Sequence, residues 1–236
     1  MKKILNILLK FLLLLVIVII LVISTFAILG HIMYEEALEK VPIKDKVTEI
    51  QNKENYTKLK DIPQIYKDAV IAAEDHRFYY HLGIDYIAII RAIFNDISFG
   101  KLKEGGSTIT QQLCKNIYFT QERKLERKFA EIFMAAEVER VIDKDTILEL
   151  YINTCFYGNN CDTLSEASRL YYNKEPNELN DYEAILIAGI PNAPSLYNPI
   201  KSEEKAKQRQ KQVLAKMVRF GFLTNEEVEE ILALGE

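Results

Sequence analysis

Residues Phe11 to Leu29 read FLLLLVIVIILVISTFAIL, and Ser24 and Thr25 are the only polar side chains among them. A helix needs about 20 apolar residues to cross the roughly 30 Å hydrocarbon core of a bilayer. A cleaved secretory signal has a shorter apolar run of about 7 to 15 residues, which ends in small residues at the cleavage site. The sequence therefore predicts an uncleaved transmembrane anchor over residues 11–30.

The charges beside this run predict its orientation. Lys2, Lys3 and Lys10 precede the run, whereas the first charged residues after it are glutamates. Short basic flanks of a membrane helix stay in the cytoplasm. We therefore expect residues 1–10 to be a cytoplasmic tail of a single-pass protein of the cell membrane, with the rest of the chain outside.

Charge and cysteine content narrow the classes of partner. The 236-residue chain has a formal net charge of −4, which argues against nucleic acid as a partner. An anionic ligand must then be held by a local cluster of basic side chains. Three cysteines are too few for a disulfide framework. Cys155 and Cys161 either pair in an oxidising exterior or remain free thiols.

The chain beyond the anchor divides into a short polar segment and a long helical one. Residues 31–61 are charge-mixed without a clear period, which predicts a stalk or linker. Further on, apolar spacing is mostly helical, and Thr163, Asn180 and Thr224 each precede a glutamate by three places, a helix-start signal. We predict a mostly α fold with one domain over residues 62–236.

The first segment that could carry catalytic residues is AVIAAEDHRFYYHLG, Ala69 to Gly83, in which an apolar run ends at Glu74 and Asp75. A carboxylate set against apolar surface can serve as a general base or acid. Alternatively, the segment is a helix that ends with two solvated acids. His81 is expected to be a hydrogen-bonded structural residue, because no second histidine or cysteine lies at metal-ligand spacing.

The second segment is GGSTITQQLCKN, Gly105 to Asn116. Its two glycines precede a helix that Ser107 or Thr108 can cap, and the free N–H groups at a helix start suit a phosphate. Donors for sugar hydroxyls or for an anion follow at Gln111, Gln112, Lys115 and Asn116. The alternative is an amide-rich surface helix that is merely capped.

The third segment is ERKLERKFAEIF, Glu122 to Phe133. One face of this expected helix carries Leu125, Phe129, Ile132 and Ala136. The opposite face then carries Arg123, Arg127 and Glu131, a positive strip with one acid that suits a pyrophosphate. Alternatively, Arg127 and Glu131 form an exposed ion pair worth about 0.2–0.5 kcal/mol.

These segments occur in order with a fourth, ILELYIN at Ile147 to Asn153. Through EDHRFYYHLG, GGSTITQQLCKN, RKFAE and ILELYIN, the chain resembles the peptidoglycan glycosyltransferases, glycosyltransferase family 51, over about residues 62–222. One departure is NNCDTL at Asn159 to Leu164, where family members usually carry a glycine-rich stretch. The resemblance implies an enzyme with a lysozyme-like helical domain behind the single transmembrane helix.

The resemblance also implies the reaction. Its substrate is lipid II, a disaccharide-pentapeptide joined through pyrophosphate to a polyprenyl chain, and the growing glycan strand is extended with inversion as polyprenyl pyrophosphate leaves. Glu74 matches the family's general base for the 4-hydroxyl of the incoming sugar. Glu131 matches the second family acid, either as an acid or as a ligand for a divalent ion such as Mg²⁺ or Mn²⁺.

Several basic and amide residues take binding roles in this scheme. Lys115 and Arg123 are expected to neutralise charge on the pyrophosphate, and Arg91 to hold the phosphate of the donor strand. The other expected substrate-binding residues are Ser107, Thr108, Gln111, Gln112, Asn116, Arg127 and Lys128. The partners so implied are lipid II, the growing glycan strand, the membrane and other proteins of cell wall synthesis.

Two further stretches bear on the assignment. Tyr86 to Gly100 is unusually apolar, and it either dips into the lipid interface or is a buried core helix. Ser202 to Lys205 spells S-x-x-K, but no S-D-N or K-T-G follows. We therefore interpret that match as chance and expect no penicillin-binding domain in this chain.

Two rival functions fit part of the sequence. A lysozyme-like hydrolase of the same glycan also needs two acids on a helical scaffold, but the basic and amide residues of the second and third segments favour a pyrophosphate donor. A non-catalytic, membrane-anchored binding protein of wall synthesis needs neither Glu74 nor Glu131, and both are present.

Overall fold

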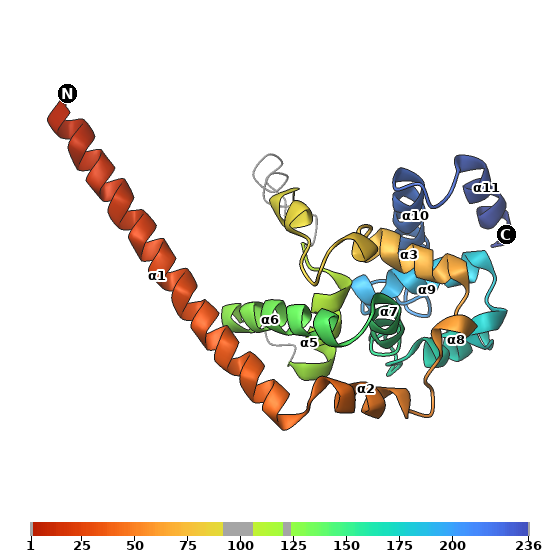
Figure 1. The fold of residues 1–236 in the computed structure, drawn as a ribbon. Coiled ribbons are helices and arrows are strands. Elements are labelled where there is room, and N and C mark those ends of the chain that lie inside the picture. The colour runs from red at the N-terminus through yellow and green to blue at the C-terminus, as the bar shows by residue number, and fades with distance from the viewer. Residues whose placement is uncertain (1, 92–105, 120–123, 236) are drawn as a thin grey trace.

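The computed structural model describes residues 2–91, 106–119 and 124–235, and Figure 1 shows their arrangement. Within these ranges the regular elements are all helices, so the predicted mostly α fold is confirmed. The α-helices with both ends described are α1 (Lys2–Lys40), α2 (Ile43–Gln51), α3 (Gln64–Glu74), α5 (Ile109–Tyr118), α6 (Leu125–Val141), α7 (Lys144–Ile152), α8 (Leu164–Tyr172), α9 (Asp181–Gly189), α10 (Glu203–Arg219) and α11 (Asn225–Ala233). Short 3-10 helices lie at Leu59–Asp61, Phe78–Tyr80, Pro176–Glu178 and Ile190–Asn192.

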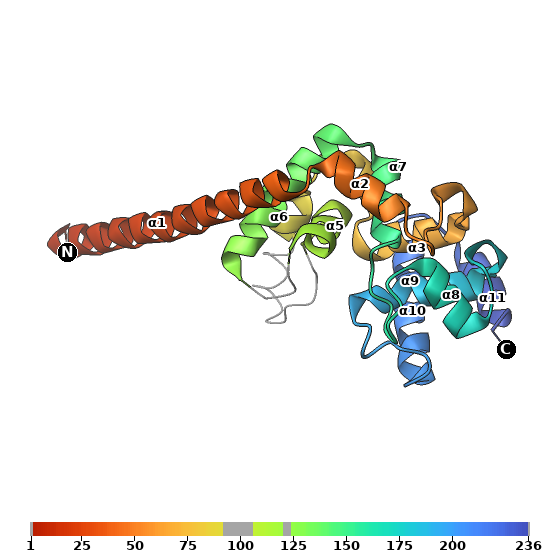
Figure 2. The same cartoon turned by 90° about the horizontal axis from the view of Figure 1, so that it is seen from below.

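Helix α1 extends well away from the body of the molecule in both views (Figures 1 and 2). It is one continuous helix of 39 residues, long and apolar enough to cross a membrane, and it contains the predicted anchor over residues 11–30. Its apolar side chains from Ile4 to Ile23 are exposed among the described residues. Such a surface is consistent with a single membrane anchor.

The end of α1 packs closely against α6. Gly30 is buried there, and a Cβ atom on it would lie 2.5 Å from the Cβ of Phe129 and 2.7 Å from the carbonyl oxygen of Glu126. At the next residue, the ring of His31 meets the ring of Phe133 edge-on, with 5.2 Å between the ring centroids. The end of α1 therefore packs directly on α6.

This packing predicts that Gly30→Ala destabilises the protein, because the added methyl group forces α1 and α6 apart. We expect a loss of about 1–3 kcal/mol of unfolding free energy, the usual cost of overpacking a close contact. Urea unfolding of the full chain in detergent, followed by circular dichroism, measures it. Ser24→Ala, at an exposed position of α1, is the control, and equal midpoints for the two variants would contradict the close contact.

The segment predicted as a stalk, residues 31–61, contributes to the folded body. Helix α1 continues to Lys40, and α2 buries Ile43 and Ile50 in the core. These two apolar residues lie seven apart, so they face the same side of two helical turns. Two residues in a polar stretch were too few for a visible period, which is why the sequence indicated a linker here.

The fourth sequence motif, ILELYIN on α7, holds the chain between α2 and α3 in place. Glu149 on α7 accepts hydrogen bonds from the Tyr56 hydroxyl and from the Leu59 N–H. The Asn153 side chain accepts from the Thr57 N–H and donates to the Thr57 carbonyl, both at 2.8 Å. The polar residues of ILELYIN are thus structural, because they satisfy backbone groups that would otherwise be buried without partners.

The helix starts follow the side-chain signals in the sequence. Capping boxes form at Thr163 with Glu166, at Asn180 with Glu183 and at Thr224 with Glu227, as predicted. The Ser202 hydroxyl accepts from the Lys205 N–H and so caps α10. The S-x-x-K match is therefore a helix cap in this fold.

The departure at NNCDTL has a conformational basis. Gly158, Asn159 and Asn160 have φ values of 84°, 51° and 60°, so three successive residues adopt the left-handed region. Asparagine enters this region at lower cost than other residues with a Cβ. The two asparagines therefore support a turn that glycines would otherwise form. Nearby, Cys155 and Cys161 are free and buried, as is Cys114.

Candidate functional site

A groove of about 940 Å³ separates two groups of helices. The end of α3 and one face of α10 line one side, and the segment before α5, α5 itself and the start of α6 line the other. In Figure 1, α3 and α10 lie on the side away from α1, and α6 lies next to α1. The groove is therefore bounded by elements from widely separated parts of the chain.

Glu74 is the last residue of α3 and faces this groove. Its side chain is 12% exposed, which excludes the alternative of a solvated helix end. Gln112 Nε2 donates to Glu74 Oε2 at 3.0 Å, and Arg209 Nη2 lies 3.4 Å from Oε1. The Tyr151 hydroxyl donates to Gln112 Oε1 at 3.2 Å, so the amide is oriented with its NH2 group toward the carboxylate.

Glu131 enters the groove from α6, with its side chain only 3% exposed. Arg127 donates to its Oε1, and Lys128 Nζ donates to its Oε2 at 2.9 Å. Lys128 also donates to the Ser107 hydroxyl at 2.7 Å, which joins α6 to the segment before α5. The alternative of an exposed Arg127–Glu131 pair is thereby excluded.

The predicted apolar face of α6 is not the buried one. Leu125 is 60% exposed and Ala136 is exposed, whereas Ala130, Glu131 and Met134 are buried. The reason is that α6 lies between α1 and the groove. Its apolar face meets α1 only in part, and the face that carries Glu131 turns inward to the groove.

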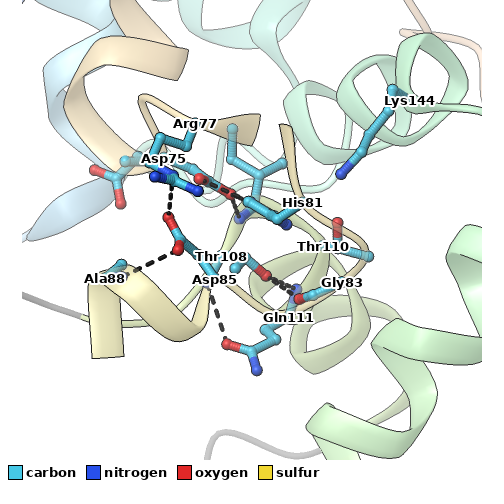
Figure 3. Close-up of polar contacts among 12 residues, drawn as sticks. Asp75, Arg77, His81, Gly83, Asp85, Ala88, Thr108, Thr110, Gln111 and Lys144 are labelled. Atoms are coloured by element: carbon cyan, nitrogen blue, oxygen red, sulfur yellow. Dashed lines mark hydrogen bonds and ion pairs between the residues drawn. The ribbon is translucent and has the colours of Figure 1, made fainter. Parts of the chain in front are cut away.

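A network behind the groove fixes the start of α5 (Figure 3). Asp75 Oδ2 accepts from the Ile109 N–H at 3.0 Å, and His81 Nε2 lies within 3.0 Å of both carboxylate oxygens of Asp75. Asp75 is 7% exposed, so neither acid that ends α3 is solvated. Adjacent acids therefore take different tasks, because Glu74 faces the groove and Asp75 holds the next helix. His81 is structural, as predicted.

Gly83 and Thr108 complete this attachment (Figure 3). The Thr108 hydroxyl donates to the Gly83 carbonyl at 2.6 Å and accepts from the Gln111 N–H as the cap of α5. Gly83 has φ +72°, and a Cβ there would lie 3.0 Å from the Ala135 backbone. Only glycine allows this turn to approach α6 so closely. The turn at Gly83, α5 and α6 are thus held in one fixed arrangement.

The structure brings most of the sequence-predicted site residues to the groove. Those that line it are Glu74, Arg91, Ser107, Gln112, Lys115, Arg127, Lys128 and Glu131. It does not bring Thr108, Gln111 or Asn116 there. Thr108 and Gln111 are buried in the capping box of α5, and Asn116 donates to the Thr154 carbonyl. Arg123 lies outside the described residues.

Sequence reasoning missed the contribution of α10. Arg209, Gln212, Lys216 and Arg219 line the groove from this helix. Their spacing of three, four and three places one helical face toward the groove, and this was the available signal. It was hard to distinguish from solvated charge, because α10 carries basic and amide residues on several faces. The other lining residues that were not predicted are Ala72, Ala73, His76, Asn192, Tyr197 and Phe220.

The groove is strongly basic within an acidic chain. Its basic lining residues are Arg91, Lys115, Arg127, Lys128, Arg209, Lys216 and Arg219, against the acids Glu74 and Glu131, whereas the whole chain has a net charge of −4. Focused positive potential in a cleft concentrates anions there. Burial, followed by the charge of Arg91, lowers the pKa of His76, which stacks on Phe220 at 3.8 Å. His76 therefore adds a polar group without adding positive charge at neutral pH.

The donor set of the groove does not fit a metal centre built from protein ligands. Within the described residues, no three histidine, cysteine or acidic side chains lie together. Both oxygens of Glu131 already accept hydrogen bonds from cations. A divalent ion here would need phosphate oxygens of a bound ligand for most of its coordination.

Exposed apolar residues lie next to the groove. Residues 86–91 are helical, and Tyr86, Ile87 and Ile90 are 67%, 54% and 55% exposed. These three side chains are therefore not part of a buried core helix. The rest of the predicted lipid-dipping segment, residues 92–100, lies outside the described residues, and the contact with lipid stays a prediction.

Comparisons with known proteins agree on one family. The family described as Transglycosylase matches residues 43–218. Penicillin-binding protein 1A of Neisseria flavescens is 43% identical over 182 residues, which are 77% of this chain and 23% of that protein. Penicillin-binding protein 1A of Aquifex aeolicus is 42% identical over 175 residues, 74% of this chain and 24% of that protein. The chain thus spans about a quarter of the length of these relatives.

Among solved structures, a crystal structure of penicillin-binding protein 1A from Haemophilus influenzae aligns with 75% of this chain and 17% of its own. The sequence identity is 24% and the TM-score is 0.44.

Proposed function

This chain belongs to the transglycosylase family, and from that premise we propose that it polymerises lipid II into peptidoglycan glycan strands. The observation that carries the proposal is the groove itself. One carboxylate, Glu74, is held by an amide and a guanidinium at the edge of a cleft with seven basic side chains. A sugar diphosphate needs both features, a base for the attacking hydroxyl and cations for the leaving group.

The proposed reaction is a single displacement. The 4-hydroxyl oxygen of the incoming sugar attacks C1 of the growing strand, and the bond from C1 to the pyrophosphate oxygen breaks. Glu74 takes the hydroxyl proton, and the pyrophosphate leaves on its polyprenyl chain with the bonding electron pair. Attack from the opposite face inverts C1, as in glycosidases that activate water with a carboxylate.

The cations of the groove would stabilise the departing pyrophosphate. Lys115, Arg127 and Lys128 line the same side as Glu131, and Lys216 and Arg219 lie across from them. Fixed charges in a cleft act most strongly on charge that develops during the reaction. A divalent ion such as Mg²⁺ or Mn²⁺ would add to this by binding the phosphate oxygens beside Glu131.

In this proposal, α1 anchors the protein in the bilayer and so keeps the reaction at the membrane surface. Helix α1 is apolar enough to span it, and three lysines lie near its amino end. We propose that the amino terminus is cytoplasmic and that the groove lies on the outer side, where a polyprenyl-linked substrate in the membrane can reach it.

Arg209 is expected to be a positioning residue for Glu74. It is 6% exposed, donates to the Gly189 carbonyl at 3.3 Å and lies 3.4 Å from Glu74 Oε1. Arg209→Gln should lower kcat by about 10-fold or more with little change in KM for lipid II, because it removes one charged partner of the base. The matched variant Gln208→Ala, on the exposed side of α10, should keep normal rates. A change confined to KM would instead assign Arg209 to substrate binding.

The function is tested with the full chain in detergent, labelled lipid II and Mg²⁺, with a chelator in a parallel reaction. Long polymer on a gel supports the proposal, and its loss with chelator supports a role for the ion. Digestion of preformed glycan without polymer would favour a hydrolase. Tight binding of lipid II with neither product would favour a non-catalytic binding protein and overturn the proposal.

A further inference from the structure

A second cavity lies where α1 leaves its apolar stretch and meets α6. Its volume is about 260 Å³, and α1, the end of α5 and the start of α6 form its walls. Met33, Ala37 and Phe119 give it apolar lining, and Lys40, Lys124 and Arg127 give it basic lining. Glu36 is the one acid among the described lining residues.

The position of this cavity along α1 sets its depth relative to a bilayer. The uncharged apolar run ends at Leu29. A rise of 1.5 Å per residue puts Met33 about 6 Å and Lys40 about 16 Å beyond that point along the helix. The headgroup layer occupies roughly 5–7 Å outside the hydrocarbon on each side. The Met33 end of the cavity therefore lies at headgroup depth, and its Lys40 end lies further from the hydrocarbon.

The lining fits one chemical class at that depth. Three cations against one acid favour an anion, and the apolar floor favours an anion that carries a hydrocarbon chain. Lysine stems can cover apolar surface while their ammonium groups reach a phosphate. We propose that this cavity binds the headgroup of an anionic phospholipid, with its phosphodiester among the basic side chains and its glycerol backbone near Met33.

Arg127 connects this lipid site to the groove, because it lines both cavities. Its Nη1 donates to Glu131, while its Nε–H is buried with no hydrogen-bond acceptor among the described residues. The Tyr118 hydroxyl, on another lining residue of the lipid site, is likewise buried without a partner there. A small rotation of Arg127 toward a bound phosphodiester gives the Nε–H an acceptor. The lipid then shares this guanidinium with Glu131.

The test measures retained lipid and therefore does not depend on the proposed enzymatic activity. The full chain is reconstituted in nanodiscs that contain equal amounts of phosphatidylglycerol and phosphatidylcholine. Native mass spectrometry then identifies the lipids that stay bound to the protein after it is released from the nanodiscs. We expect the wild type to retain phosphatidylglycerol preferentially. Lys40→Gln should reduce that preference about fivefold, the effect of one lysine at a membrane surface. The preference should also fall as salt rises.

Lys44→Gln is the matched control, because Lys44 is an exposed lysine four residues further on that does not line the cavity. Its preference for phosphatidylglycerol should equal that of the wild type. Equal losses in the two variants, or equal retention of both lipids by the wild type, would overturn the proposal. Displacement of phosphatidylglycerol by inorganic pyrophosphate would also overturn it, since the cavity would then be a pyrophosphate site.

Discussion

Replacing Glu74 with glutamine is expected to abolish glycan polymerisation while leaving the fold intact. The amide is the same size as the carboxylate, so its oxygen can still accept from Gln112, which Tyr151 holds in position. What is lost is the ability to take the proton of the sugar hydroxyl. General base catalysis contributes about 10²- to 10⁴-fold, so the rate of polymer formation from labelled lipid II should fall by that factor.

Asp68→Asn is the control for this variant, because it makes the same acid-to-amide change on the same helix. Asp68 accepts from Gln64 and does not line the groove. Its variant should polymerise at the wild-type rate, and thermal unfolding should show that both variants keep the fold. Near-normal polymer from Glu74→Gln would remove Glu74 from the mechanism and leave the basic groove as a binding site only.

The parts of the fold that could be predicted are those that depend on residues close together in the sequence. The apolar run of α1 is one continuous stretch of sequence, and the caps of α8, α9 and α11 depend only on residues within one helical turn. The structure has all of them at the predicted positions. The prediction that Glu74, Lys115 and Glu131 share one site did not come from such signals. It came from the resemblance to a family, because no local sequence pattern indicates that α3, α5 and α6 meet.

The parts that could not be predicted depend on packing between distant segments. Helix α10 follows Glu74 by more than a hundred residues, yet Arg209 reaches Glu74 Oε1 at 3.4 Å. The burial of Glu131 could not be read from the sequence, because a buried acid with two cationic partners has the same spacing as a solvated ion pair. Burial is a property of the assembled helices, and a charge pattern alone does not contain it.

Glu131→Gln is expected to lower both stability and activity. In the wild type, both carboxylate oxygens accept from cations, and the amide would turn its NH2 group toward either Arg127 or Lys128. We expect a loss of about 2–3 kcal/mol in unfolding free energy. This is less than for a fully buried pair, because the Lys128 side chain is 42% exposed. Urea unfolding in detergent measures it.

Glu137→Gln is the matched control, on the same helix and in an ion pair of the same kind. Glu137 pairs with Arg140 at 2.9 Å, but the Arg140 side chain is 78% exposed. Exposed pairs contribute about 0–1 kcal/mol, so this variant should unfold near the wild-type midpoint. Equal midpoints for the Glu131 and Glu137 variants would mean that burial adds nothing to the Glu131 pair.

The loss of activity distinguishes the possible tasks of Glu131. If it orients Arg127, then Arg127→Gln and Glu131→Gln act on one interaction, and the double variant should lose less than the sum of the two single losses in free energy. If Glu131 is instead a metal ligand, a higher Mg²⁺ concentration should restore the polymerisation rate of the Glu131→Gln variant. We expect coupling without restoration by Mg²⁺, since Arg127 and Lys128 occupy both carboxylate oxygens. Additive losses would separate the two residues and assign Glu131 a direct part in pyrophosphate departure.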